Sequence, residues 1–346
     1  MLAPLEDRLD ALAPGLQGEL VIDASAVTAL DTSGAWLLHR TALALEARGQ
    51  SVRIEGLRPE FEALLRLIAS RTAAAGTAAA TPPGVLAALG RIAWEGLRSA
   101  YGLLSFVGEV AIALARSIRN PRRVRWRAIA HNLQTAGFEA LPITGLLSFL
   151  LGVVIAYQGA VQLRRFGANV YIADLVGLSM LRELSPLMTA IIVAGRSGSA
   201  YTAQIGTMKV TEEVDALRTI GIGPLDLLVL PKVIALAIAL PLLAVYTDVM
   251  GVLGGMMMAR AQLNVDFTTF LHRFEEAVSL TSYAIGIGKT PAFAVIIALV
   301  GCYQGFRVGG SAESVGRQTT VSVVQSIFLV IVIDAAFSIA FSWLGL

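Results

Sequence analysis

The chain has 346 residues, of which 55% are hydrophobic and only 15% are charged, and its mean hydropathy is +0.70. Soluble proteins carry about 25% charged residues, so this composition indicates a membrane protein. The formal net charge of +2 is too small to suggest nucleic acid as a partner, and the single Cys302, set in an apolar run, excludes an internal disulfide.

The first 70 residues are predicted to form a small soluble α/β domain. The opening stretch "MLAPLEDRLDALAPG" contains acids and lacks the apolar region of a signal peptide, so we expect the N-terminus to stay in the cytoplasm. Strand-like and helical patterns alternate over residues 19–25, 35–49, 51–57 and 58–68. Gly49 is a stop signal for the first helix, and Pro59 suits the first turn of the second. This alternation is typical of an α/β fold.

A linker and an amphipathic helix are predicted next. Residues 71–84, "RTAAAGTAAATPPG", have the composition of a linker. Residues 85–118 place charges every few positions among large apolar residues, which predicts a helix lying on the membrane surface. The basic run "RNPRRVRWR" (119–127) is compatible with nucleic-acid binding, but directly before an apolar segment it favours a positive-inside anchor.

Five apolar segments follow, each longer than the roughly 20 residues that cross a bilayer. They lie near residues 138–163, 175–203, 226–260, 279–304 and 320–344. With the N-terminus inside, the C-terminus is expected outside. The predicted fold class is therefore an α-helical integral membrane protein with one interfacial helix, five transmembrane helices and a small N-terminal α/β domain. The G-x-x-x-G spacing in "GVLGG" (251–255) predicts a helix-packing face.

The loop between the second and third spans contains a short amphipathic helix, "TEEVDALR" (211–218). Thr211 is predicted as its N-cap, with Glu212 and Glu213 in the first turn and Asp215 one residue beyond the central valine. Two interpretations stay open from these residues alone. The helix is either a solvated surface element or a coupling helix that docks into an ATPase subunit.

The stretch "GIGKTP" (286–291) ends like a phosphate-binding P-loop. A complete P-loop needs a further glycine where this chain has Tyr283, and a strand before it and a helix after it. Here Pro291 follows at once, within an apolar run. An ATP site in this chain is therefore not predicted.

Several charged residues fall inside the predicted spans. They are Arg182, Glu183, Asp248, Lys289 and Asp334. A charge at mid-membrane costs about 2.5 to 3.5 kcal/mol on insertion scales, so such side chains are expected to face one another or a wet cavity. For Asp248, snorkelling or capping is also open. Lys289 is expected to meet an acid such as Glu183 or a lipid headgroup.

The stretch "LRELSPLMTAIIVAGRSGSAYTAQIGTMKVTEEVDALRTIGIGPLDLLVLPK" (181–232) closely resembles the signature of the MlaE-type permeases of MCE lipid transporters. The later stretches "GCYQGFRVGGSAESVGRQTTVSVVQS" and "VIDAAF" match the same family. The resemblance covers roughly residues 85–346. It implies a homodimer in the bacterial inner membrane that moves phospholipids between the inner and outer membranes, together with a cytoplasmic ABC ATPase and a periplasmic MCE-domain protein.

The same resemblance implies roles for individual residues. Arg182, Glu183, Lys289 and Asp334 occupy motif positions associated with the lipid pathway, and Lys289 is expected to line a lipid-accessible cavity at the dimer centre. Coupling to the ATPase is assigned to Thr211, Glu212, Glu213 and Asp215. The permease is not itself an enzyme, so we assign no catalytic residue, metal site or cofactor to this chain, and ATP is used by the partner ATPase.

The N-terminal domain resembles STAS domains through its strand, the stretch "DTSG" (31–34) and the helix that follows. In such families the serine of this pattern is phosphorylated in some members, which points to Ser33. Asp31, Thr32 and Ser33 are therefore candidates for ATPase contact or phosphorylation, with helix capping as the alternative for Thr32 and Ser33. The domain is short at its start, so an incomplete sheet is possible on this sequence.

Two other functions are compatible with a STAS domain joined to membrane spans. A secondary anion transporter usually has many more spans and carries its STAS domain last. A membrane-anchored regulator would not need five spans that contain charged residues. Both alternatives predict that neither an ATPase nor an MCE protein co-purifies with this chain.

Overall fold

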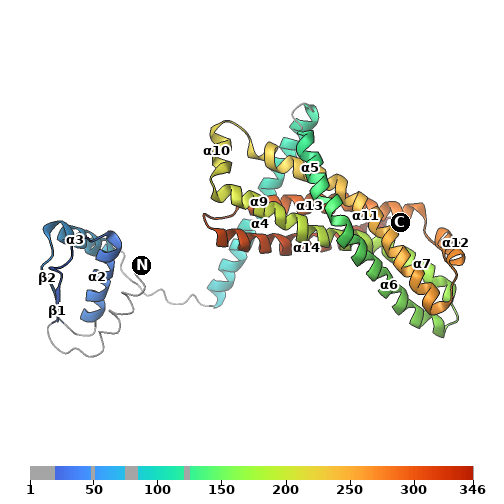
Figure 1. Cartoon of the computed structure of the whole chain (residues 1–346), viewed down its shortest axis with the longest axis horizontal. Coiled ribbons are helices and arrows are strands. Elements are labelled where there is room, and N and C mark those ends of the chain that lie inside the picture. The colour runs from blue at the N-terminus through green and yellow to red at the C-terminus, as the bar shows by residue number, and fades with distance from the viewer. Residues whose placement is uncertain (1–19, 48–50, 75–84, 121–124, 346) are drawn as a thin grey trace. The chain divides into compact units, whose positions relative to one another are not determined.

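The computed structural model describes residues 20–47, 51–74, 85–120 and 125–345. The chain divides into two compact units, residues 1–93 and 94–346, and each is described by itself. The described residues are predominantly helical (Figure 1).

The N-terminal unit contains a parallel pair of strands, β1 (Leu20–Asp23) and β2 (Val52–Glu55). Parallel strands need a crossover connection, which helix α2 (Thr32–Glu46) provides. Helix α3 begins at Pro59, as predicted, and continues to Ala74, four residues into the predicted linker. The order strand, helix, strand, helix is confirmed. The rest of the linker and Gly49 lie outside the described residues.

From residue 85 onward the described chain is helical. The helices are α4 (Val85–Arg119), α5 (Trp126–Ala136), α6 (Leu141–Arg165), α7 (Ile172–Ser179), α8 (Ser185–Val193), α9 (Ser199–Val210), α10 (Glu213–Thr219), α11 (Leu230–Leu263), α12 (Phe267–Ala277), α13 (Leu280–Phe306) and α14 (Ala312–Trp343). Two 3-10 turns, η3 (Phe138–Ala140) and η4 (Asn169–Tyr171), precede α6 and α7. Three π-helical segments, η5 (Met180–Leu184), η6 (Ala194–Gly198) and η7 (Leu225–Val229), interrupt the second span and open the third.

Six helical stretches in the described part of the chain are long and apolar enough to cross a membrane. Five of them contain or overlap the predicted spans, and the last helix begins at Ala312, eight residues before the predicted 320. The sixth stretch, Leu89–Ser117, belongs to the helix predicted to lie on the membrane surface. Its surface placement stays a prediction.

Glycines let α6 and α11 pack closely. A side chain at Gly152 would lie 1.9 Å from the carbonyl oxygen of Gly251, and one at Gly254 would lie 2.1 Å from that of Phe149. Backbone atoms cannot yield as a flexible side chain can, so these positions require glycine. The packing face predicted from "GVLGG" is confirmed.

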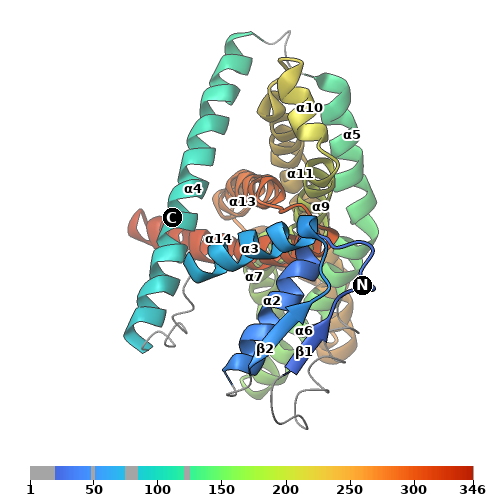
Figure 2. The same ribbon diagram turned by 90° about the vertical axis from the view of Figure 1, so that its left-hand side faces the viewer.

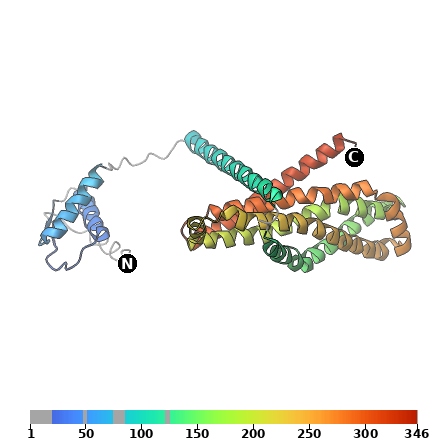
Figure 3. The same cartoon turned by 90° about the horizontal axis from the view of Figure 1, so that it is seen from above.

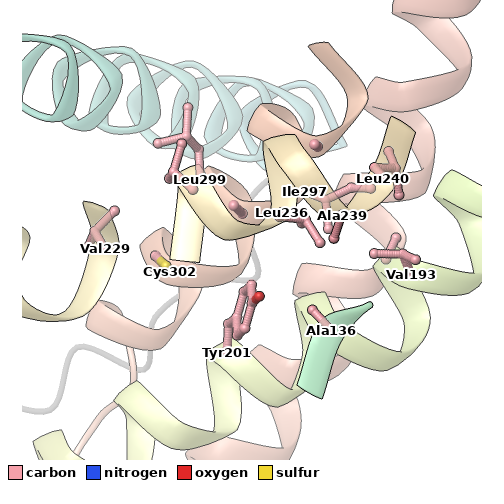
Figure 4. Packing of buried hydrophobic residues seen from close by; sticks show 14 of the residues in the cluster. Ala136, Val193, Tyr201, Val229, Leu236, Ala239, Leu240, Ile297, Leu299 and Cys302 are labelled. Atoms are coloured by element: carbon pink, nitrogen blue, oxygen red, sulfur yellow. The ribbon is translucent and has the colours of Figure 1, made fainter. Parts of the chain in front are cut away.

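The core of the second unit joins several helices around Tyr201, Leu236 and Ile297 (Figure 4). Cys302 is fully buried in this core, as predicted for a small apolar residue. The later part of α4 joins it through Phe106, whose ring lies 5.6 Å from Tyr303.

The helical unit has α10 at one end and α12 at the other (Figure 1). Helix α14 projects beyond its neighbours toward the C-terminus (Figures 2 and 3). The buried side chains of α14 form a stripe at every fourth position, Ser322, Ser326, Val330 and Asp334. Residues four apart share a helix face, so one narrow face of α14 packs inward.

Candidate functional site

Three charged side chains meet inside the helical unit, and we call them the charge cluster: Glu183, Lys289 and Asp334. The Lys289 ammonium donates to Glu183 Oε2 over 2.6 Å and to Asp334 Oδ1 over 3.1 Å. The three residues come from η5, α13 and α14. The expectation that Lys289 meets Glu183 is confirmed, and Asp334 is a second partner.

The local sequence explains where Glu183 points. Pro186 has no backbone N–H to donate to the carbonyl four residues earlier, and its ring crowds that carbonyl. The helix widens into the π-helical segment Met180–Leu184 directly before it. Such single wide turns re-aim side chains and are frequent at functional sites. On α13, Gly286 lies against this segment, because a side chain there would approach the Leu181 carbonyl oxygen to 2.0 Å.

Exposure divides the charge cluster into a buried part and an open part. The Lys289 side chain is completely buried, whereas the side chain of Glu183 is 38% exposed and that of neighbouring Arg182 is 26% exposed. Arg182 lies 3.7 Å from Glu183. Lys289 is thus buried in the single chain, and its place in a lipid-accessible cavity at the dimer centre stays a prediction. Within the predicted set, Arg182 and Glu183 have the most exposed side chains in the single chain.

Further polar contacts support these charges. The Ser338 hydroxyl, one turn beyond Asp334, lies 3.3 Å from both Glu183 carboxylate oxygens. The "GIGKTP" stretch lies within the continuous helix α13. Among the described residues no group of three or more His, Cys, Asp or Glu side chains is placed to hold a metal ion.

Asp248 stands apart from the charge cluster. It lies near the middle of α11, is only 3% exposed, and neither snorkels to an interface nor caps a helix. Both suggestions made from sequence are therefore wrong. Its two carboxylate oxygens have no hydrogen-bond partner within the described part of the chain.

Sequence reasoning missed the polar contacts that join α6, α8 and α11. Ser148 donates to the Thr247 carbonyl over 2.6 Å, and the hydroxyls of Thr189 and Thr247 lie 2.8 Å apart. Another missed residue is Lys232, which is 4% exposed and donates to Gln204 over 2.8 Å. Serine and threonine are common in membrane helices, so no local pattern marks these pairs.

The predicted coupling segment forms the seven-residue helix α10. Thr211 is not its N-cap. It ends α9 and donates its hydroxyl to Thr207 O and to the Glu213 carboxylate, while Glu212 occupies the N-cap position with a left-handed backbone at φ 61°. Val214 is buried, and Glu212, Glu213 and Asp215 are exposed. The three acids thus face outward from an anchored helix.

In the N-terminal unit, Asp31 is the N-cap of α2. Its carboxylate accepts from the Gly34 N–H over 2.7 Å. Thr32 and Ser33 lie in the first turn and are exposed. The alternative that Thr32 or Ser33 caps the helix is therefore wrong, because Asp31 performs that role and leaves both hydroxyls on the surface.

At the α12 end, a salt bridge holds α12 against α7. Arg273 donates to both carboxylate oxygens of Asp174, over 2.8 and 2.6 Å, and also contacts Glu276. The hydrogen bonds with Asp174 raise the pKa of the Arg273 guanidinium. This bidentate pair fixes the connection between the third and fourth spans.

Comparisons with known proteins now add to this geometry. Residues 129–340 match the family described as Permease MlaE, and residues 2–71 match the family described as Mlab, STAS domain. The chain is similar to a probable ABC transporter permease of Rickettsia typhi, with 38% identity over 67% of this chain and 87% of the relative.

Two relatives come from photosynthetic organisms. A probable ABC transporter permease of Synechocystis is 36% identical over 61% of this chain and 80% of its own length. The chloroplast protein of Arabidopsis thaliana named TRIGALACTOSYLDIACYLGLYCEROL 1 is 30% identical over 71% of this chain and 67% of its own length. The N-terminal STAS domain and the permease region thus match two separate families.

Proposed function

Because this chain belongs to the Permease MlaE family, we propose that it is the membrane subunit of a transporter that moves phospholipids between the inner and outer membranes of a bacterium. It is a multi-pass membrane protein with an MlaB-type STAS domain at its N-terminus. In this proposal a separate ATPase hydrolyses ATP, and this chain holds no cofactor. The family match speaks against a secondary anion transporter and against a membrane-anchored regulator.

The observation that carries the proposal is the charge cluster. A fully buried ammonium between two carboxylates is costly to build inside a membrane, and such groups mark transport pathways more often than simple anchors. Glu183 and Arg182 remain partly exposed beside it, so a zwitterionic headgroup finds both signs of charge there. The Arabidopsis relative is named after a diacylglycerol lipid. This name supports the proposal that the present chain also transports a lipid.

The cluster also suggests how binding could be coupled to movement. Lys289 joins three helical segments through its two partners. A headgroup that competes for Glu183 weakens the link between η5 and α13, and leaves Asp334 as the remaining partner of Lys289. Differential binding of this kind is what a ligand needs to shift a conformational equilibrium.

The proposed protein partners bind this chain at surfaces away from the charge cluster. A homodimer forms through α14, most of whose apolar side chains face outward, as at Phe328 with 62% exposure. The ATPase docks on α10 and on the STAS domain in the cytoplasm. A periplasmic MCE-domain protein contacts the opposite side, so the N-terminus is cytoplasmic and the C-terminus periplasmic.

Co-purification tests the assembly. The tagged full-length chain, purified from its native membrane in mild detergent, is expected to bring down an ABC ATPase, an MCE-domain protein and phospholipid. Mass spectrometry identifies all three. A monomeric chain that brings down neither protein, with the STAS domain intact, would contradict the proposal.

A conservative change at the open end of the cluster tests the lipid pathway. Glu183→Gln keeps an oxygen that can accept from Lys289 but removes the charge, so we expect normal folding and about tenfold slower lipid transport in proteoliposomes. Glu276→Gln changes an exposed acid at the α12 end and serves as the matched control. Wild-type transport by a well-folded Glu183→Gln protein would rule out the pathway role.

A further inference from the structure

A narrow cleft lies where α4 ends and where α5 and η7 begin, and we call it the arginine cleft. Its charged lining residues are Arg116 of α4, Arg125 directly before α5, and Asp226 of η7. Apolar side chains line it beside these charges, including Ile129, Leu230 and Ile234. None of the three charge-cluster residues lines this cleft, so the two sites are separate.

The arginine cleft lies where three stretches that are apolar enough to cross a membrane end or begin. The stretch within α4 ends at Ser117, and two others begin at Trp126 and Leu225. Charged and apolar side chains meet here, as expected where a protein passes from membrane to water. Only residues 220–224 separate α10 from η7, so the cleft lies on the same side of the membrane as α10.

The charged side chains of the cleft are open to a ligand. Arg116, Arg125 and Asp226 are all exposed. Arg116 donates to the Ile112 carbonyl of its own helix over 3.4 Å. Among the described residues neither arginine forms a salt bridge, with Asp226 or with any other acid. Both guanidiniums therefore keep donors for an anion that enters the cleft.

The sequence around the cleft is strongly basic. Residues 110–138 contain six arginines and no acid. A basic segment beside a membrane helix fixes the orientation of the chain, and that role requires charge but no common site. Arg116 and Arg125 come from two different helices and yet line one cleft. Two guanidiniums at one site suit a phosphate group, to which each can donate two N–H bonds.

The net charge of the cleft selects among phosphate-bearing ligands. Two arginines and one aspartate leave the described lining with one net positive charge. An anionic headgroup cancels this charge, whereas a zwitterionic headgroup leaves it uncompensated. Basic pockets between membrane helices are recurrent sites for anionic lipid headgroups.

The apolar neighbours favour a lipid over a free phosphate. Ile129, Leu230 and Ile234 offer apolar surface, which a soluble anion does not use and the glycerol and upper acyl chain of a lipid can cover. The enclosed part of the cleft has a volume of about 20 Å³, enough for one water molecule. A phosphate oxygen therefore enters it while the rest of the headgroup lies at its mouth.

We propose that the arginine cleft binds the phosphate of an anionic phospholipid, and that the bound lipid joins the end of α4 to the starts of α5 and η7. The site goes beyond the proposed transport function and does not require it. Because a ligand that binds the folded form raises its stability, the anionic lipid stabilises the folded chain.

Native mass spectrometry and thermal unfolding of the full-length chain in detergent test the site. The probes are phosphatidylglycerol and phosphatidylethanolamine with identical acyl chains. In the wild type we expect the glycerol lipid to bind about tenfold more tightly, as charge-assisted hydrogen bonds allow, and to give the larger rise in melting temperature. The double variant Arg116→Gln, Arg125→Gln should bring the two lipids close to parity.

A matched control removes the same charge from the same segment. Arg119 and Arg127 are exposed and do not line the cleft, so the double variant Arg119→Gln, Arg127→Gln should keep most of the preference. Equal loss in the two double variants would reduce the effect to general surface charge and overturn the inference.

An opposite change keeps the test decisive if the cleft double variant folds poorly. Asp226→Asn retains both arginines and removes the acid of the cleft. It should tighten binding of phosphatidylglycerol about fivefold, as one more net positive charge near a membrane surface allows. Unchanged or weaker binding by the folded variant would contradict the proposal.

Other occupants give distinct results that also overturn the inference. Inorganic phosphate that protects the chain as strongly as the lipid would indicate a site for free anions, and a preference for phosphatidylethanolamine would indicate an ammonium site at Asp226. A cleft double variant that keeps its lipid preference but no longer co-purifies with the ATPase would assign the cleft to that protein. Lipid binding is measured without ATP or transport, so its outcome and that of the proposed function are separate.

Discussion

At the scale of single residues, Lys289 is the central member of the charge cluster, because it pairs with both Glu183 and Asp334. Its ammonium is fully buried and lies within 3.1 Å of two carboxylates. Removing it leaves two acids of the same sign close together in a low-dielectric region. Breaking a buried pair costs more than replacing the whole set with neutral groups, because the remaining charge stays desolvated.

We therefore expect Lys289→Ala to destabilise the folded chain by about 3 kcal/mol. This value lies at the low end of the range for breaking a buried ion pair, because Glu183 is partly exposed. Thermal unfolding followed by size-exclusion chromatography in detergent measures this loss. The triple variant Lys289→Met, Glu183→Gln, Asp334→Asn removes every charge of the cluster and should recover most of the stability. A single variant as stable as the wild type would show that the ion pairs contribute nothing.

Sequence patterns indicated the members of the cluster but not its geometry. Charged residues in apolar spans are conspicuous, so Glu183, Lys289 and Asp334 are found directly. Their contacts join positions 106 and 45 residues apart, and only the packing of three helices decides which acids reach the lysine. The isolation of Asp248 is not visible in sequence for the same reason.

At the scale of elements, the closest helix packing in the described chain depends on glycine. Gly152→Ala puts a methyl group where the Gly251 carbonyl already lies, so α6 and α11 must separate. We expect a loss of at least about 2 kcal/mol, as for overpacked cores. Unfolding in detergent reports the change.

The same substitution elsewhere gives the control. A methyl group added at Gly316, within α14, would meet no atom within 4 Å, so Gly316→Ala should be neutral or stabilise the helix by up to about 1 kcal/mol. If both variants behave alike, the close contact of α6 and α11 is not what requires glycine.

The entry to α10 offers a second element-scale prediction. Glu212 has a left-handed backbone at φ 61°, which costs a residue with a side chain roughly 1 kcal/mol. Glu212→Gly should therefore raise the melting temperature, whereas Glu213→Gly, inside the helix, should lower it. Calorimetry of the purified chain checks both. Opposite signs are expected, and destabilisation by Glu212→Gly would refute the strain argument.

The length of the apolar segments predicted the five long spans, and glycine spacing predicted one packing face. The π-helical segments were not predicted, because a wide turn leaves the apolar pattern almost unchanged. Pro186 and Pro231 were visible signals beside two of them. The left-handed Glu212 was also missed, since Thr211 is the better N-cap by residue type.

At the scale of the whole molecule, composition and the order of motifs carried most of the prediction. A shift from a polar to an apolar chain near residue 85 separates the STAS domain from the permease region, and both match known families. Contacts between helices far apart in the sequence could not be predicted, and the charge cluster arises from such contacts.

The STAS domain should bind the ATPase and have no catalytic role of its own. Deleting residues 1–70 is expected to leave the spans inserted and to lower the amount of ATPase that co-purifies, because one of two proposed contacts is lost. Quantitative blotting of the purified complex measures the ratio of the two subunits. Full complex yield and transport without the domain would contradict this role.

Point variants in the STAS domain distinguish the loss of its contact with the ATPase from the loss of its own folding. Ser33→Asp adds a charge on an exposed hydroxyl position beside the Asp31 cap, so it should weaken ATPase binding while the domain stays folded. Asp31→Ala removes the cap and should cost about 1 kcal/mol of domain stability. Circular dichroism of the purified chain and the ATPase ratio together distinguish the two effects. If Ser33→Asp binds the ATPase as the wild type does, the contact surface lies elsewhere on the domain.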